Sequence, residues 1–184
     1  MSQKIIIISS SPRRKGNSET LCLQFQKGAV ENGHHVELIN INDYQLGFCK
    51  ACDYCHQHNN QCILKDDADK IIQKMIAADV WVFASPIYFY SITAQLKTLF
   101  DRMYAREYEI RNNPKKKQAY LILTSGSPNS DDMIGAIESY RGFIKVLRQV
   151  DDLGIINGLG AFEKNDVYNH PSYRAAYLAG LGIK

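Results

Sequence analysis

The sequence predicts an α/β fold in which a doubly wound, five-stranded parallel sheet lies between two layers of helices. Short apolar segments alternate with helical segments along the chain, and the helical segments carry apolar residues at a spacing of three and four. This alternation favours a parallel sheet, because short connections and covered sheet faces leave few other arrangements. At 184 residues, the chain is expected to form one domain, residues 1–184.

The first predicted strand, over residues 5–8, consists of four isoleucines. Isoleucine is β-branched and packs well on a pleated surface, so the run is typical of a strand buried on both faces. Three serines and a proline follow, then three basic residues, before a helix predicted over 18–32 that Gly33 ends. Hydroxyls, backbone N–H groups, cations and a helix N-terminus all favour an anion, above all a phosphate.

The remaining elements follow from the same patterns. Further strands are predicted over residues 36–39, 80–84, 119–123 and 154–159, and further helices over 66–78, 93–104, 131–149 and 173–181. A cysteine-rich loop is expected over 43–65, and Lys115–Lys117 is expected to lie in a solvated loop. Cys22 is expected to be a small residue of the core.

Composition argues against several classes of protein. Hydrophobic residues make up 45% of the chain and charged residues 22%, which is ordinary for a globular protein. The formal net charge of +3 is too small to indicate a nucleic acid partner. No secretory signal or membrane-length segment is visible, and five cysteines fit a reduced setting, so we expect a cytoplasmic protein without a membrane partner.

Three polar segments follow predicted strands, at the points where the strands of a parallel sheet would end. They cover residues 9–18, 85–91 and 124–127. Open parallel sheets bind ligands outside the carboxyl ends of their strands, where the strand order reverses. The convergence of three such segments is therefore the pattern of a nucleotide site.

The first polar segment lacks the motifs of several phosphate-binding loops. It contains neither G-x-x-x-x-G-K-[ST] nor G-x-G-x-x-G, which excludes an NTPase P-loop and argues against a dinucleotide on this turn. No cysteine is followed six residues later by arginine, so a C-x5-R phosphatase loop is absent. What remains is a loop rich in serine that suits one terminal phosphate, with an ordinary polar turn as the alternative.

The second polar segment places three adjacent aromatic residues, Tyr88, Phe89 and Tyr90, directly after a predicted buried strand. Aromatic faces and backbone amides in such a position could flank a flat heterocycle and bind its edge. The alternative is that these rings cap the core or an oligomer interface.

Two stretches, SSSPRRKGNSETL and SPIYFYSITAQLKTLFDRMY, resemble the NADPH-dependent FMN reductase family of flavodoxin-like proteins. The resemblance extends from residue 5 to about residue 160 and implies a flavodoxin-like, three-layer α/β/α sandwich that binds FMN. It implies that Ser11, Arg13, Asn17 and Ser18 hold the FMN phosphate, with Ser9 beside them, that Pro86, Ile87, Tyr88, Phe89 and Ser91 line the ribityl chain and isoalloxazine ring, and that Thr124, Ser125 and Gly126 close the ring pocket.

The chain departs from the family pattern at two points. Ser10 stands where many members have glycine, and we expect its side chain to narrow the approach to the phosphate. Tyr90 and Ser91 stand where the family more often has glycine or asparagine after the aromatic pair. The family's contacts with the edge of the isoalloxazine ring therefore do not transfer directly to these two positions.

The resemblance also implies an activity. NAD(P)H would pass hydride to FMN, and reduced FMN would reduce a quinone, an azo or nitro compound, or free flavin. No catalytic side chain is expected, because the flavin carries the electrons while the protein supplies position and electrostatics. Relatives of this size commonly pair, so the resemblance implies a homodimer or larger homo-oligomer. The expected partner in the reaction is a small electron acceptor or a redox protein.

Four of the five cysteines, Cys49, Cys52, Cys55 and Cys62, follow the spacing C-x2-C-x2-C-x6-C. Compact spacing of this kind suits a [4Fe-4S] cluster, whereas zinc sites more often pair two C-x2-C elements across a longer insert. The loop is similar to that of the iron–sulfur flavoproteins, which share the flavin fold. Free thiols beside the flavin are the alternative.

Two other functions therefore remain open. One is an iron–sulfur flavoprotein that passes single electrons through a [4Fe-4S] cluster and FMN. The other is a non-enzymatic, flavodoxin-like electron carrier, which the slightly basic charge disfavours, because flavodoxin carriers are usually strongly acidic.

Overall fold

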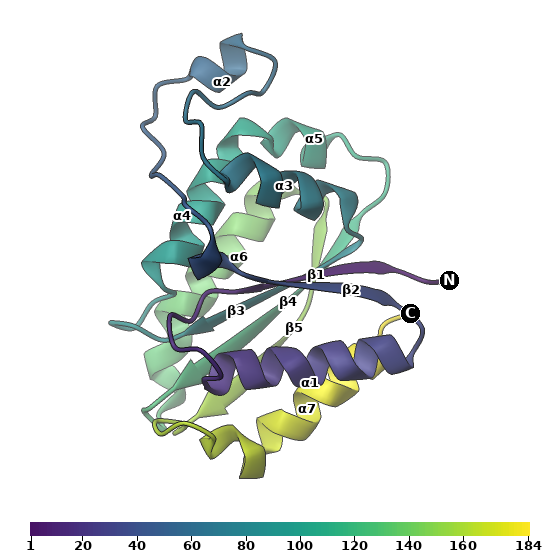
Figure 1. Cartoon of the computed structure of the whole chain (residues 1–184), viewed down its shortest axis with the longest axis vertical. Helices are drawn as coiled ribbons and strands as arrows, with labels where there is room; N and C mark the ends of the chain where they lie inside the picture. Colours follow the sequence, from purple (N-terminus) through teal and green to yellow (C-terminus); the bar gives the residue numbers. More distant parts are fainter.

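A computed structural model describes all residues, 1–184, as a three-layer α/β/α sandwich (Figure 1). At its centre is a five-stranded sheet in the order β2-β1-β3-β4-β5, and each neighbouring pair of strands is parallel. This is the strand order of the flavodoxin-like fold. The predicted fold class is confirmed.

The strands are β1 (Lys4–Ser9), β2 (His35–Asn40), β3 (Val80–Pro86), β4 (Lys117–Ser125) and β5 (Val150–Leu159). The main helices are α1 (Asn17–Glu31), α3 (Ala68–Ala77), α4 (Ala94–Arg102), α6 (Ile134–Leu147) and α7 (Pro171–Leu181), and two short helices are α2 (Tyr54–Gln57) and α5 (Glu107–Arg111). Helices α1 and α7 cover one face of the sheet, and α3, α4 and α6 cover the other (Figure 1). None of the helices has the length and apolar character required to cross a membrane.

Strand β1 contributes to both halves of the core. Ile5 and Ile7 pack in the cluster beneath α1 and α7, and Ile6 and Ile8 pack in the cluster beneath α3, α4 and α6. All four side chains are buried, as expected for a strand covered on both faces. Cys22 is also fully buried, which confirms its expected place in the core.

Helices α1 and α7 touch through two glycines. A Cβ atom added to Gly28 would overlap the carbonyl oxygen of Tyr177, and one added to Gly180 would overlap that of Phe25. The absence of side chains at both positions lets the helix backbones meet directly. The C-terminal helix thereby covers the core under β1, β3 and β4.

Two predicted boundaries differ from the structure at the junction of α6 and β5. Helix α6 ends at Leu147 rather than at residue 149, because Arg148 adopts a left-handed backbone conformation with φ of 62°. Strand β5 begins at Val150 rather than at residue 154. Because β5 is an edge strand, its polar residues Asp151 and Asp152 can point to solvent. These two polar residues interrupt the apolar pattern, so the sequence does not show where the strand begins.

The expectation that Lys115–Lys117 lies in a solvated loop is wrong for Lys117. Lys117 begins β4 and is buried, and its Nζ donates to the carbonyl oxygens of Ile76 (2.7 Å) and Ala78 (2.6 Å) at the end of α3. The ammonium also lies 5.8 Å from the centre of the Trp81 ring. The basic run therefore contains one structural lysine that satisfies carbonyl groups at a helix end.

Replacement of Gly28 by alanine should destabilise the protein by about 1–3 kcal/mol, because the new methyl group collides with the backbone of α7. The matched control is Gly142→Ala in α6, where nothing lies within 4 Å of the added methyl group. That control should gain about 0.5–1 kcal/mol, because alanine suits a helix interior better than glycine does. Denaturant unfolding monitored by circular dichroism measures both, and equal stabilities of the two variants would contradict the α1–α7 packing.

Candidate functional site

A pocket of about 610 Å³ lies at the carboxyl ends of β1, β3 and β4. It brings together ten residues of the expected cofactor site: Ser11, Arg13, Asn17, Pro86, Ile87, Tyr88, Phe89, Thr124, Ser125 and Gly126. Three others, Ser9, Ser18 and Ser91, are not among the residues that line it. The pocket sits where β1 and β3 are neighbours but the following helices lie on opposite faces of the sheet.

The first turn of α1 provides unpaired donors at one end of this pocket. The backbone N–H groups of Asn17, Ser18 and Glu19 have no acceptor in the chain. Arg13 adds a positive charge on the preceding loop, and the helix dipole directs its positive end the same way. This end of the pocket is therefore suited to an anion.

The side chains of Asn17 and Ser18 connect the loops around the pocket. Asn17 Nδ2 donates to the carbonyl oxygens of Ala161 (3.1 Å) and Glu163 (2.8 Å), in the segment after β5. Ser18 Oγ lies 2.6 Å from Thr124 Oγ1 at the end of β4, and Ser18 is 1% exposed. The Ser18 hydroxyl is therefore engaged in the interior, and only its backbone N–H group remains without a partner in the chain.

Ser9 and Ser10 lie beneath the pocket rather than in its wall. Both are fully buried, and Ser10 Oγ donates to the carbonyl oxygen of Ala84 (2.8 Å) and accepts from Thr93 Oγ1 (2.8 Å). The expectation that the side chain of Ser10 narrows the approach to a phosphate is wrong, because its hydroxyl instead binds β3 and the first residue before α4. Ser9 Oγ is buried without a hydrogen-bond partner.

The aromatic segment forms a tight turn over the pocket. Tyr88 N–H donates to the Ser91 carbonyl (3.0 Å), and Ser91 N–H donates to the Tyr88 carbonyl (3.1 Å). Ser91 thus closes the turn through its backbone. The two residues between them, Phe89 and Tyr90, have positive φ values of 48° and 62°. Such a turn normally takes glycine or asparagine, so Tyr90 departs from the residue types that its own backbone conformation favours. Phe89 is 101% exposed.

Six lining residues were not assigned to the expected cofactor site: Gly16, Tyr90, Ser127, Asp132, Ala161 and Phe162. The first three lie within the polar segments that the sequence indicated, and the other three lie outside them. Ala161 and Phe162 belong to the segment after β5, which ends at the same edge of the sheet as β1, β3 and β4. The rule that led to the other three loops could have included this segment. Phe162 lies against Gly126 so closely that a Cβ atom on that glycine would meet its ring at 2.6 Å.

The four cysteines of the predicted motif line a second, separate hollow, together with Arg102 at the end of α4. Cys55 is buried, Cys62 is partly buried, and Cys49 and Cys52 are exposed. All are free thiols. Burial raises the pKa of the Cys55 thiol.

The backbone of this loop turns sharply around the hollow. Ala51, Asp53, Asn59 and Asn60 all have positive φ values, between 49° and 61°. No three Cys, His, Asp or Glu side chains are close enough to share one metal ion, which argues against a zinc site in this arrangement. The hollow holds only about 20 Å³, so the loop must open before a cluster could enter.

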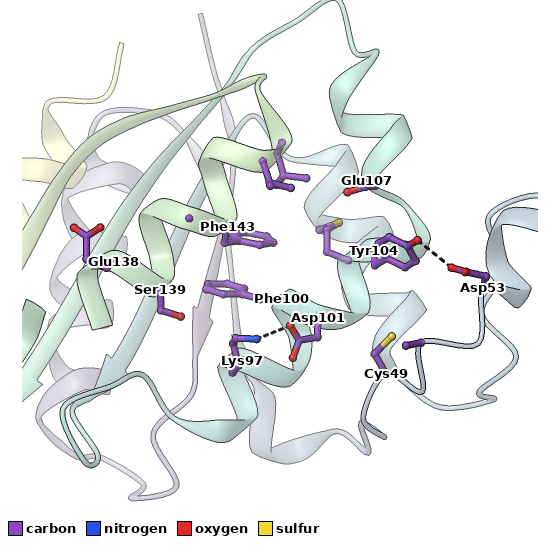
Figure 2. Close-up of a pocket in the computed structure, with 15 residues that line it drawn as sticks. Cys49, Asp53, Lys97, Phe100, Asp101, Tyr104, Glu107, Glu138, Ser139 and Phe143 are labelled. Carbon is purple, nitrogen blue, oxygen red and sulfur yellow. Dashed lines mark hydrogen bonds and ion pairs between the residues drawn. The ribbon is translucent and has the colours of Figure 1, made fainter. Parts of the chain in front are cut away.

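A larger groove of about 790 Å³ runs between α4 and α6 and reaches the cysteine loop at Cys49 (Figure 2). Phe100 and Phe143 stack in parallel within it, with ring centres 3.9 Å apart. Tyr104 donates a hydrogen bond to Asp53 (3.0 Å), which raises the pKa of the tyrosine. The sequence did not indicate this groove, because the facing sides of two separate helices form it.

A profile of the NADPH-dependent FMN reductase family matches residues 3–134. The chain belongs to this family. The match covers strands β1 to β4 and includes most of the carboxyl-edge pocket described above. The NADPH-dependent FMN reductases are flavoprotein oxidoreductases, so the expected family and its general class of chemistry are confirmed.

Two relatives of this FMN reductase family member come from the archaeon Methanocaldococcus jannaschii, and both are iron-sulfur flavoproteins. One is 39% identical over 99 residues, which span 54% of this chain but only 51% of the relative. The other is 31% identical over 172 residues, which span 88% of this chain and 78% of the relative.

A solved structure, the NAD(P)H:quinone oxidoreductase from Methanothermobacter marburgensis, has the same fold, with a TM-score of 0.72. The alignment covers 98% of this chain and 96% of the other at 20% sequence identity. At that identity, the likeness establishes the flavodoxin-like architecture of this FMN reductase family member and nothing finer.

Replacement of Tyr90 by glycine should stabilise the protein by about 1 kcal/mol, because a non-glycine residue at positive φ is strained. The midpoint of thermal unfolding should rise by about 2–4 °C. The control is Tyr108→Gly, at an exposed helical position in α5, which should lose about 0.5–1 kcal/mol. A loss of stability in both variants would contradict the strain assigned to the aromatic turn.

Proposed function

We propose that this chain is an FMN-dependent oxidoreductase that takes electrons from NAD(P)H and passes them to a small acceptor such as a quinone, an azo or nitro compound, or free flavin. The observation that carries the proposal is the carboxyl-edge pocket. It combines free N–H groups at a helix N-terminus with an aromatic turn a short distance away. An anion site beside a ring-binding wall suits a flavin mononucleotide.

The phosphate of FMN would be bound at the α1 end of the pocket. The N–H groups of Asn17, Ser18 and Glu19 would donate to its oxygens, and Arg13 would offset its charge. Ser11 also lines this end and contributes a hydroxyl. These donors are held by the backbone of a buried strand and a long helix, so they are oriented before a ligand arrives.

The ring system would lie between the aromatic turn and the end of β4. Ile87 N–H donates to the Thr124 carbonyl (2.8 Å), which fixes the distance between these two walls. When bound, FMN would supply the ability to accept and release electrons. The chain's own residues position the ring and exclude water, and no histidine lines the pocket that could serve as a general acid or base.

The proposal includes a homodimer or larger homo-oligomer. Phe89 and Tyr90 are 101% and 64% exposed beside the pocket, and large exposed aromatic side chains are enriched at protein interfaces. A second copy that covers this turn would remove the open side of the flavin site from water.

Replacement of Asn17 and Ser18 together by alanine should weaken FMN binding while the fold is retained. The double variant loses the contacts from Asn17 to the segment after β5 and from Ser18 to Thr124, so the loop is no longer held in place. Fluorescence titration of FMN should show an affinity at least about tenfold lower, which corresponds to about 1.4 kcal/mol.

The matched control is Asn129→Ala with Ser130→Ala. This Asn-Ser pair also stands at the start of a helical segment, but neither residue lines the pocket. The control should bind FMN as the wild type does. Equal affinity of all three proteins would overturn the assignment of the α1 loop to the phosphate.

A second candidate function is favoured by one observation: Cys49, Cys52, Cys55 and Cys62 all line the same hollow. Four thiolates are the ligands of a [4Fe-4S] cluster, and two relatives are iron-sulfur flavoproteins. In this function, the four cysteines would hold the cluster, and the cluster would supply single-electron transfer. The protein would then exchange electrons with a redox protein instead of, or in addition to, NAD(P)H.

Protein purified without oxygen should contain about four iron and four acid-labile sulfide atoms per chain if the cluster is present. Cys55→Ala should lose both, whereas Cys22→Ala, which removes a buried cysteine of the core, should keep them. Wild-type protein without iron or sulfide would exclude the second function. Steady NAD(P)H oxidation by such iron-free protein would at the same time support the first.

A further inference from the structure

One side chain, Arg102, connects the two ends of the cysteine loop. Arg102 is the last residue of α4, and its side chain is 2% exposed. Its Nη1 donates to the Gly47 carbonyl (2.7 Å) and to Asp66 Oδ2 (2.6 Å), and its Nη2 donates to Asp66 Oδ1 (3.0 Å). Gly47 precedes the first cysteine of the loop, and Asp66 follows the last.

The Asp66 carboxylate completes this connection. Besides Arg102, it accepts hydrogen bonds from the N–H groups of Gly47 (2.8 Å) and Ala68 (3.1 Å). Burial alone would raise the pKa of Asp66, but the hydrogen bonds from Arg102, Gly47 and Ala68 outweigh it and lower the pKa. The pair is therefore ionised at neutral pH, and it holds the base of the loop closed while the cysteines lie beyond it.

One nitrogen of the guanidinium has no hydrogen-bond partner. Arg102 Nε is buried and has no hydrogen-bond partner, although a buried donor is normally satisfied. Arg102 lines the hollow with the four cysteines, including Cys62. Burial lowers the pKa of Arg102, but Asp66 and, to a smaller extent, Cys62 raise it.

We propose that Arg102 is the positioning residue of the cysteine site, which fixes the base of the loop and donates its Nε–H to a sulfur atom of the [4Fe-4S] group held there. The inference rests on the second candidate function. Hydrogen bonds to the sulfur atoms of a cluster raise its reduction potential, and residues that orient metal ligands contribute to metal retention.

Arg106 lies in the same region and forms ion pairs that are not part of the cysteine site. Its guanidinium binds Asp69 (3.0 Å) and Glu109 (2.7 Å), but it neither contacts Gly47 nor lines the hollow. Arg102 and Arg106 thus provide a matched pair: two arginines four residues apart, each bound to carboxylates, of which one belongs to the cysteine site.

The test compares Arg102→Lys with Arg106→Lys. Lysine keeps the positive charge but loses the planar fork and the Nε–H donor. Each protein is reconstituted with iron and sulfide without oxygen, and two quantities are measured: the rate of iron loss to a chelator and the midpoint potential of the cluster. Arg102→Lys should lose iron about tenfold faster and have a more negative potential, whereas Arg106→Lys should match the wild type.

A third measurement uses protein without iron. Trypsin can cut after the exposed Lys50, and cleavage there should be faster in Arg102→Lys than in Arg106→Lys, because the loop is released at its base. FMN affinity at the other end of α4 should be unchanged in both, which shows that the fold is intact. If Arg102→Lys does not fold, Asp66→Asn breaks the same connection from the other side and should give the same losses.

The outcomes separate the inference from the function on which it rests. If the wild type takes up no iron, the cluster and the donor role of Arg102 are both wrong. If the wild type is loaded, and Arg102→Lys and Asp66→Asn match Arg106→Lys in iron loss, potential and cleavage, the cluster stands and the role of Arg102 is overturned.

Discussion

The structure depends on one topological constraint: β1 and β3 are neighbours in the sheet, but the chain leaves them toward opposite faces. Helix α1 follows β1 on one face, and α4 follows β3 on the other (Figure 1). Two diverging connections leave a crevice between them that no side chain of the core fills. Hydrogen bonds from Ser10 to Ala84 and from Thr93 to Ser10 hold the two connections together beneath that crevice, so the pocket has a rigid floor.

Helix α4 relates the two candidate sites. Thr93 caps its first turn beside the carboxyl-edge pocket, and Arg102 ends it at the cysteine hollow. Nine residues separate the two ends, which corresponds to about 14 Å along the helix axis. A flavin and a metal cluster would therefore be held at opposite ends of one rigid element, and a change at one end need not disturb the fold at the other.

Local rules of protein structure are broken mainly at these two sites. Phe89 and Tyr90 have left-handed backbone conformations without being glycine, and Arg102 Nε is buried without an acceptor. Asn17 Oδ1 is also buried without a partner at the start of α1. Such features cost stability and persist only where the surrounding structure holds them, and they are concentrated at functional sites.

The sequence by itself determined the fold class and most of the carboxyl-edge pocket. The isoleucines of β1 and the polar residues after β1, β3 and β4 are local signals, because a buried strand and its terminal loop are contiguous in the chain. Tertiary structure alone decided which groups of those residues face the pocket. The hydroxyls of Ser10 and Ser18 point inward because hydrogen-bond partners lie on β3, on β4 and just before α4. Arg102 likewise binds Gly47 and Asp66, which are distant from it in the sequence. Such contacts have no local pattern in the sequence, since they depend on which distant backbone atoms folding brings within reach.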